Sequence, residues 1–456
     1  MRNDNKMALT PEERLVQHFD RRSVLVGATA LSVTALGGCA AQNGMSIART
    51  ATGIVTRAGT ALMLDGKRYR FAGANIWYGA YLGADAAYGD RARLGRELDR
   101  LKALGIINLR ILASAEEGRL DHSIKPGFRT KDGWNETLFT GLDYCMAEVA
   151  KRGMKAVLYL GNFWEWSGGM MTYLDYTTGS IINMGDPAHP WPAFADRNTD
   201  FYRNEKAVAL YHDHVRRLVG RTNSVTGKAY RDDPAIMSWQ LCNEPRAGGS
   251  DDVIARTLVA YFAWIGSTAK LIRSIDTNHL VSLGHEGTIA ANGREDVFVD
   301  AHVEIDYVTA HIWPLNWGWV NGKDLAGTWE AGSAKVQAYL DTHIRLAKTM
   351  DKPLVIEEFG FPRDGEAYDP SSTTLFRERY YAMIYRAAMN DKVIAGTNFW
   401  AWNGEARSPH ADYRFKEGDT HYMGDPPHEP QGWYGNFDSD AAMLSLIRDH
   451  AAQMAG

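Results

Sequence analysis

The chain has 456 residues, a formal net charge of −5 at pH 7 and three cysteines. Lys and Arg are dispersed along it and produce no basic field, which excludes nucleic acid as an expected partner. The length suits one catalytic domain, because barrels of alternating strands and helices often exceed about 400 residues. Cys145 and Cys242 are interpreted as small buried apolar side chains and not as a disulfide.

Residues 1–52 have the pattern of a processing segment. A polar stretch leads to Arg21-Arg22 and then to an apolar run from Val24 to Leu36, which is too short to span a bilayer stably. The arginine pair resembles a twin-arginine export signal, and Leu36-Gly37-Gly38-Cys39 resembles a lipoprotein processing box that would acylate Cys39. Ordinary cleavage near Ala40-Ala41 is the alternative. We expect an exported protein that is periplasmic, lipid-anchored or secreted.

From residue 53 the chain is predicted to form a short hairpin, with a turn at Asp65-Gly66, followed by alternating strands and helices. The expected strands are 69–75, 106–112, 155–160, 236–242, 280–283, 307–311, 354–358 and 395–400. The expected helices are 91–104, 135–151, 206–219, 253–275, 334–350, 374–389 and 441–455. Eight such repeats favour a closed (β/α)8 TIM barrel of class α/β over an open doubly wound sheet. No phosphate-binding glycine motif follows the first strand. Residues 53–456 are therefore predicted to be one barrel domain.

Two long insertions, 164–204 and 403–438, follow the third and eighth predicted strands. Both are rich in Gly, Pro, Asp and aromatic residues and are interpreted as too polar for the core. Loops after strands lie on the face of a barrel that carries its chemistry, so both are predicted to wall a cleft. The second insertion is expected either to block one end of that cleft or to be a solvated surface loop.

Two glutamates close apolar strand patterns: Glu244 in Asn243-Glu244-Pro245, and Glu358 in Glu358-Phe359-Gly360. Two carboxylates facing one cavity provide the acid and the nucleophile that cleavage of a glycosidic bond requires. Burial and a nearby like charge are expected to raise the pKa of the acid, whereas a cation, predicted to be Arg110, should keep the nucleophile ionised. Adjacent strand residues face opposite sides, so Glu358 and not Glu357 is expected to enter the cleft.

The ordered set Arg110, Asn243-Glu244-Pro245, His311, Glu358-Phe359-Gly360 and Phe399-Trp400 resembles glycoside hydrolase family 5 over roughly residues 53–450. This resemblance implies a retaining mechanism with Glu244 as general acid/base and Glu358 as nucleophile, their carboxyl groups about 5 to 5.5 Å apart. It also implies that Asn243 binds the sugar 2-hydroxyl, that Arg110 and His311 support the nucleophile, and that Trp400 stacks on the sugar.

The chain departs from the family pattern at two positions. Many members carry Tyr two residues after the His, whereas this chain has Trp313, which lacks a phenolic hydroxyl. Asn162 stands where some relatives have His. The segments around these positions nevertheless resemble the β-1,4-mannanase branch more than the cellulase branch. We predict that Trp77, Asn162, Trp164, Trp313 and Trp400 bind the substrate through aromatic faces and hydrogen bonds.

The sequence thus predicts a monomeric endo-β-1,4-mannanase that acts on mannan or manno-oligosaccharides without metal or organic cofactor. The alternatives are a β-1,4-glucanase or exo-β-mannosidase of the same family, or a carbohydrate-binding lipoprotein without activity. Glu244 and Glu358 argue against the last, because a binding-only barrel needs no converging carboxylates that repel. His212-Asp213-His214 is interpreted as a solvated helix face and not as a metal site, since adjacent helix positions do not face one another.

Overall fold

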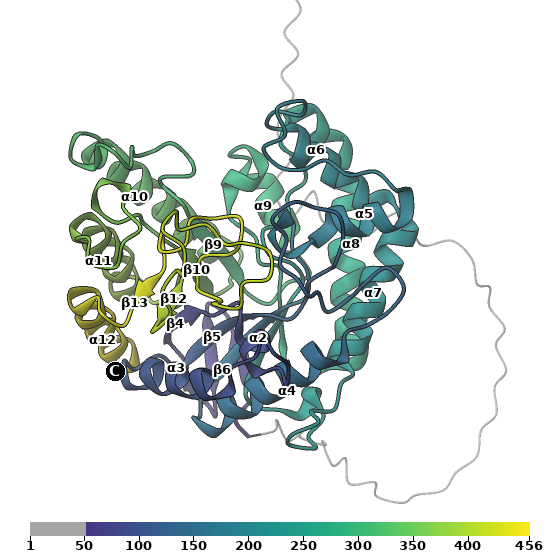
Figure 1. Ribbon diagram of the computed structural model, residues 1–456, viewed down its shortest axis with the longest axis horizontal. Helices are drawn as coiled ribbons and strands as arrows, with labels where there is room; N and C mark the ends of the chain where they lie inside the picture. Colours follow the sequence, from purple (N-terminus) through teal and green to yellow (C-terminus); the bar gives the residue numbers. More distant parts are fainter. Residues whose placement is uncertain (1–51) are drawn as a thin grey trace, which may run out of the picture. The chain divides into compact units, whose positions relative to one another are not determined.

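The computed structural model describes residues 52–456, which lie within one compact unit, Thr50–Gly456 (Figure 1). The predicted export signal and the predicted acylation of Cys39 lie outside the described residues. Within the described part, no helix has both the length and the apolar character required to cross a membrane. Cys145 and Cys242 are both buried free thiols.

The chain enters the barrel through three short antiparallel strands, β1 (Val55–Ala58), β2 (Ala61–Leu64) and β3 (Lys67–Arg68). They include the predicted hairpin, and its turn residue Asp65 has a positive φ of 49°. Val55 and Leu62 pack in one apolar cluster with Phe71 and Met237, near the start of two barrel strands. These strands therefore close the end of the barrel opposite the carboxyl ends of its strands.

Eight parallel strands form the barrel in the order β8-β7-β6-β5-β4-β11-β10-β9, and a bridge between Ser282 and Tyr307 joins the two ends of that order. They are β4 (Phe71–Asn75), β5 (Asn108–Leu112), β6 (Lys155–Tyr159), β7 (Ile236–Gln240), β8 (Leu280–Ser282), β9 (Val308–Ile312), β10 (Leu354–Phe359) and β11 (Ile394–Phe399). Nearly every strand residue is buried, as expected for a sheet covered on both faces. The predicted (β/α)8 barrel is confirmed.

The outer helices agree with the predicted ones within a few residues, with one exception. They are α3 (Arg91–Ala103), α4 (Glu136–Lys151), α7 (Glu205–Val219), α8 (Asp251–Ile275), α10 (Leu325–Thr349), α11 (Leu375–Asn390) and α12 (Ala441–Ala455). The exception is α10, which begins at Leu325 and not at 334. Its first turns contain Gly327 and Gly332, which weaken a helical pattern, but the Asp324 side chain accepts from Gly327 N at 3.0 Å and caps the helix. Short helices α2 (Gly79–Gly83) and α9 (Glu295–Ala301) were not predicted.

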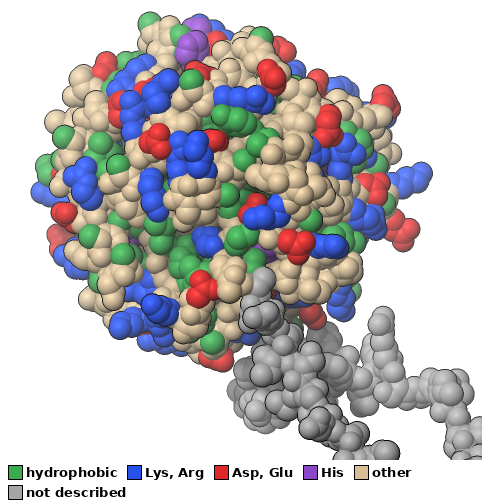
Figure 2. All heavy atoms as spheres, turned by 90° about the horizontal axis from the view of Figure 1, so that it is seen from below, with side chains coloured by type: hydrophobic (Ala, Val, Ile, Leu, Met, Phe, Trp, Pro, Cys, Tyr) green, Lys and Arg blue, Asp and Glu red, His purple; other side chains and the backbone are tan. Residues whose placement is uncertain are grey.

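The interpretation of both insertions as too polar for the core is wrong. The first forms α5 (Gly169–Thr178) and α6 (Ala193–Asn198), and α5 buries Met170, Met171 and Tyr173 in the main apolar cluster. The second buries Tyr422 and Tyr434 in the same cluster. The second insertion runs between β12 (Trp402–Gly404) and β13 (Asn436–Phe437), which pair and bring its ends together. Figure 2 shows one face of the molecule, on which acidic and basic side chains are interspersed.

Candidate active site

Glu244 follows β7 in a left-handed backbone conformation, with φ of 51°. This conformation is uncommon for a residue with a side chain and is found where the surrounding structure enforces it. Here the backbone N–H of Asn243 donates to Gly161 O at 2.8 Å and that of Glu244 donates to Gly284 O at 2.9 Å. Neighbouring segments on both sides therefore fix the turn that presents Glu244 to the interior.

Glu358 lies on β10, where the pairing with β9 shifts register between Ile356 and Glu358. The expected alternation of faces does not hold at this irregularity. Glu358 lines the central cavity, but Glu357 also points into the barrel, because its Oε2 accepts from Gln240 Nε2 at 2.7 Å. The rule that excluded Glu357 from the interior assumes a regular strand, and a bulge breaks that assumption.

Arg110 is fully buried on β5 and faces Glu358, to which its Nη1 donates. Its remaining N–H groups donate to neutral acceptors: Nη1 to Asn75 Oδ1 at 3.2 Å, Nε to Gln240 Oε1 at 2.8 Å and Nη2 to Asn243 Oδ1 at 2.7 Å. The guanidinium also stacks over the Tyr159 ring at 4.4 Å. A positive charge is thus held rigidly against one of the two glutamates, as the sequence predicted for Arg110.

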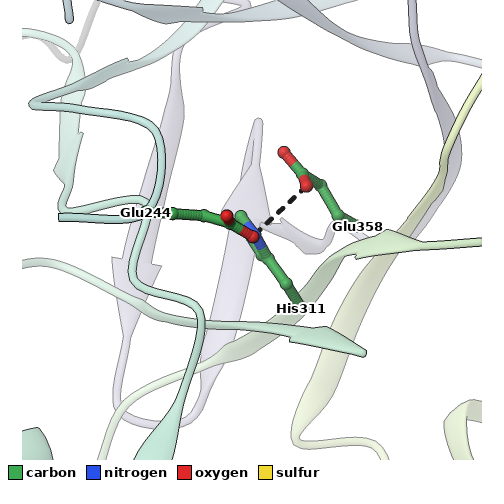
Figure 3. Close-up of side chains that lie close together, drawn as sticks. All are labelled: Glu244, His311 and Glu358. Carbon is green, nitrogen blue, oxygen red and sulfur yellow. Dashed lines mark hydrogen bonds and ion pairs between the residues drawn. The ribbon is translucent and has the colours of Figure 1, made fainter. Parts of the chain in front are cut away.

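His311, near the end of β9, lies between the two glutamates (Figure 3). Its Nδ1 is 2.6 Å from Glu244 Oε1 and 3.3 Å from Glu358 Oε2. One carboxylate oxygen of Glu244, one of Glu358 and one ring nitrogen of His311 all lie within 4.8 Å of one another. The two carboxylates therefore converge, and one imidazole bridges them.

The pKa of Glu244 does not shift in the expected direction. Burial alone would raise this pKa, but the hydrogen bond and charge of His311, together with Arg246 and the Trp164 indole N–H, leave it lowered. Burial alone would lower the pKa of His311, but Glu358, Glu244 and Glu357 raise it well above its usual value. Both shifts have the same cause, because the 2.6 Å contact between His311 Nδ1 and Glu244 Oε1 favours a protonated imidazole beside an ionised carboxylate.

A cavity of about 520 Å³ opens above these groups. It is lined by Trp164, Trp166, Met184, Trp191, Asn243, Glu244, Arg246, Glu286, Ile289, Asn292, Trp313, Asn316, Trp317, Glu358, Trp400, Pro426, His428 and Glu429. Both insertions contribute to it, from Trp164 to Trp191 and from Pro426 to Glu429, as predicted. The lining combines flat aromatic faces with a few polar groups, which is the composition of a saccharide site.

Arg246 and Glu286 are charged residues that face Glu244, and sequence analysis did not predict either of them. Arg246 Nη2 donates to Glu286 Oε2 at 2.5 Å, and both residues line the cavity. Burial, opposed by Arg246 and reinforced by the charge of Glu244, raises the pKa of Glu286 to about 7. Their positions after β7 and β8 were a usable signal, because residues following barrel strands reach the active face.

Glu429, in the second insertion, was also missed. It is buried at the cavity wall, and burial raises its pKa well above the usual range, reinforced by the charges of Asp425, Glu358 and Glu244. No local pattern distinguishes it from other loop glutamates, since its burial depends on how the insertion folds back. Asp425 organises that fold by accepting from the backbone N–H groups of Gly432, Tyr434 and Gly435.

Of the predicted substrate-binding residues, Trp164, Trp313 and Trp400 line the cavity, whereas Trp77 and Asn162 lie behind it. Trp77 is 1% exposed, and its Nε1 donates to Gly424 O at 3.0 Å, so it packs in the core. Asn162 is fully buried and accepts from Asn243 Nδ2 at 3.1 Å. It therefore orients Asn243 and has no exposed atoms for a sugar to contact.

The interpretation of residues 212–214 as a solvated face is wrong for His214. This side chain is fully buried, and its Nε2 hydrogen-bonds Ala113 O at 2.8 Å. His212 pairs instead with Thr268 Oγ1 at 3.0 Å. The two histidines have separate partners and serve packing between elements.

Comparison with known proteins agrees with this geometry. Residues 52–456 match the family described as GH family 5 beta-mannosidase-like. The chain is 29% identical over 365 residues to mannan endo-1,4-beta-mannosidase 1 of Oryza sativa subsp. japonica, covering 76% of this chain and 78% of that protein. The structure is similar to the glycoside hydrolase family 5 mannosidase from Rhizomucor miehei, with a TM-score of 0.79 and 33% identity over 88% of this chain and 98% of that one. A variant of that mannosidase in complex with mannosyl-fructose has a TM-score of 0.76 and 33% identity over 88% of this chain and 97% of its own.

Proposed function

This chain belongs to glycoside hydrolase family 5, among its mannanases and mannosidases, and on that premise we propose that it hydrolyses β-1,4-mannosidic bonds with retention of anomeric configuration. The observation that carries the proposal is the convergence of Glu244 and Glu358, with ligand atoms within 4.8 Å of one another. Retaining enzymes hold their carboxyl groups about 5 to 5.5 Å apart, whereas inverting enzymes leave room for a water at about 6.5 to 9.5 Å.

In the proposed mechanism Glu358 attacks the anomeric carbon while Glu244 protonates the departing glycosidic oxygen. Glu244 then accepts a proton from the water that releases the sugar from Glu358. The proton that Glu244 donates comes from His311 Nδ1, 2.6 Å away. Arg110 holds Glu358 in position for attack. Asn243 Oδ1 accepts from Arg110, one N–H of its amide donates to Asn162, and the other N–H is the proposed donor to the sugar 2-hydroxyl.

The proposed substrate is β-mannan or its oligosaccharides. Support comes from the name of the rice relative and from the mannosyl-fructose bound to the Rhizomucor mannosidase variant. We propose endo cleavage, as the name of the rice relative suggests. Exo-acting β-mannosidase is the second candidate, because Pro426, His428 and Glu429 of the second insertion line the cavity. A loop that closes one end of such a cleft favours binding of the end of a sugar chain.

The test is to incubate the purified protein with mannan, glucomannan, carboxymethylcellulose and xylan and to resolve the products by size over time. A ladder of manno-oligosaccharides supports endo action, and mannose or mannobiose from the outset supports the exo candidate. The anomer first formed, followed by proton NMR, tests retention. Glu358→Gln is the control. Cleavage of carboxymethylcellulose in preference to mannan would overturn the substrate proposal.

From the N-terminal pattern we further propose export through Arg21-Arg22, with Cys39 as the acylated residue. Replacing both arginines with lysine should retain the protein in the cytoplasm when cells are fractionated. Cys39→Ser should release an exported protein from the membrane fraction. Unchanged distribution in either variant would contradict the corresponding part of this proposal.

A further inference from the structure

Glu357 is a third buried carboxylate beneath the two cavity glutamates. It is 1% exposed, and the register shift on β10 points it inward behind Glu358. Its Oε2 is 2.7 Å from Gln240 Nε2, 3.6 Å from Arg110 Nε and 3.6 Å from His311 Nε2. Within residues 52–456 its Oε1 has no hydrogen-bond partner. A carboxylate is costly to bury in this way unless cations compensate it.

The contact with His311 involves the ring nitrogen that faces away from the cavity. Nδ1 already contacts Glu244 and Glu358, and Nε2 has no hydrogen-bond partner among the described residues. Glu357 Oε2 is the carboxylate oxygen near this nitrogen. Both edges of the imidazole therefore face negative charge, which favours the doubly protonated ring.

The remaining charged or titratable groups around His311 come from four elements. They are Arg110 on β5, Glu244 and Arg246 after β7, His285 and Glu286 after β8, and Glu358 on β10. Arg246 Nη2 lies 2.5 Å from Glu286 Oε2, so these two groups are paired with each other. Arg110 and His311 are therefore the two basic groups that lie against the carboxyl groups of Glu244, Glu357 and Glu358.

We propose that Glu357 is a positioning residue that holds His311 in its cationic form and so retains, up to alkaline pH, the proton that Glu244 donates. The effect on catalysis rests on the proposed retaining mechanism. The effect on the charge state of His311 does not. Without Glu357 the site would contain one negative charge fewer. All of its protons would then dissociate more readily, since removing a nearby anion lowers the pKa of a cationic imidazole and of a carboxyl group alike.

The experiment compares wild type, Glu357→Gln and Glu116→Gln in the full chain. Glu116 is a matched control, because it is also a fully buried glutamate with one oxygen that has no partner among the described residues, and it does not line the cavity. Nitrogen-15 NMR of labelled histidines follows both ring nitrogens of His311 with pH, and the His311→Gln spectrum assigns the signal. This measurement requires no substrate, so it remains decisive even if the proposed activity is wrong.

We expect the pKa of His311 to fall by about one unit or more in Glu357→Gln and to be unchanged in Glu116→Gln. In the same variant the alkaline limb of kcat/KM against pH should move to lower pH by a similar amount, while KM below that limb changes little. An unchanged His311 titration in folded Glu357→Gln would overturn the proposal. A fall in activity without a shift of the alkaline limb would reduce Glu357 to a packing role. If Glu357→Gln does not fold, Glu357→Asp provides the second test: it retains the charge and should keep the alkaline limb within a few tenths of a unit of wild type.

Discussion

The floor and the walls of the cavity are built in different ways. The floor consists of side chains from barrel strands, Arg110, His311, Glu357 and Glu358, which are linked to one another by polar contacts of up to 3.6 Å. The walls come from the two insertions and from other loops after barrel strands, and aromatic faces such as Trp191, 57% exposed, border open space. The charged groups of the floor depend on one another for their positions and protonation, whereas the walls provide aromatic contact surface. We infer that the floor determines the chemistry and the walls determine which sugars are accepted.

The sharpest test of the floor is Glu358→Gln. It should lower kcat by on the order of 10⁴-fold or more, because the amide cannot attack the anomeric carbon. Saccharide binding, measured by calorimetry, should remain within a few-fold of wild type, since the walls are untouched. Glu116→Gln should retain normal turnover. Substantial turnover by the Glu358→Gln variant would show that Glu358 is not the nucleophile.

Arg110→Lys tests whether the floor depends on one rigid guanidinium. An ammonium group cannot reach Asn75, Gln240, Asn243 and Glu358 together, as Arg110 does. We expect kcat to fall by roughly 10²-fold and the free energy of unfolding by roughly 3 kcal/mol, both measured on the purified variant. Arg96→Lys, at the exposed side of the pair with Glu405, should have a much smaller effect, because solvent screens that pair. Equal effects of the two substitutions would contradict a special role for the floor.

The charge on His311 should also be visible in stability against pH. Its pKa is raised in the folded state, so it contributes stability that is fully present below the unfolded pKa of about 6.5 and is lost as pH rises toward the folded value. Between pH 7 and 9 the free energy of unfolding of wild type should fall more steeply than that of His311→Gln, by up to about 1.4 kcal/mol per pH unit. Denaturant titrations at several pH values measure this difference. Parallel curves would indicate a neutral imidazole.

Trp191→Ala tests the walls and should have the smallest effect. Loss of one exposed aromatic face should raise KM for manno-oligosaccharides about 2- to 10-fold, with kcat and the unfolding free energy nearly unchanged. Val259→Ala, at an exposed position that does not line the cavity, is the control. A fall in kcat of the Trp191 variant without a change in KM would break the division between walls and floor.

Sequence analysis was most accurate where local patterns carry the signal. Apolar strand runs ending in Asn243-Glu244 and Glu358 predicted both the barrel and the two converging carboxylates, because residues at the ends of parallel strands must meet at one face. The prediction started helix α10 at 334 and not at Leu325, because Gly327 and Gly332 weaken the helical pattern. Trp77 was assigned to the substrate because its segment resembles the mannanase branch, and a local pattern does not tell whether an aromatic side chain packs in the core or lines a cleft.

The amino-acid sequence by itself determined the class of fold, the family and the identity of the two glutamates. Only the tertiary structure decided that Glu357 turns inward, that Arg246, Glu286 and Glu429 reach the cavity, and that carboxylates around His311 raise its pKa. The reason is physical: strand periodicity is a property of consecutive residues, whereas a bulge, a loop folding back and a balance of buried charges depend on groups far apart in the chain.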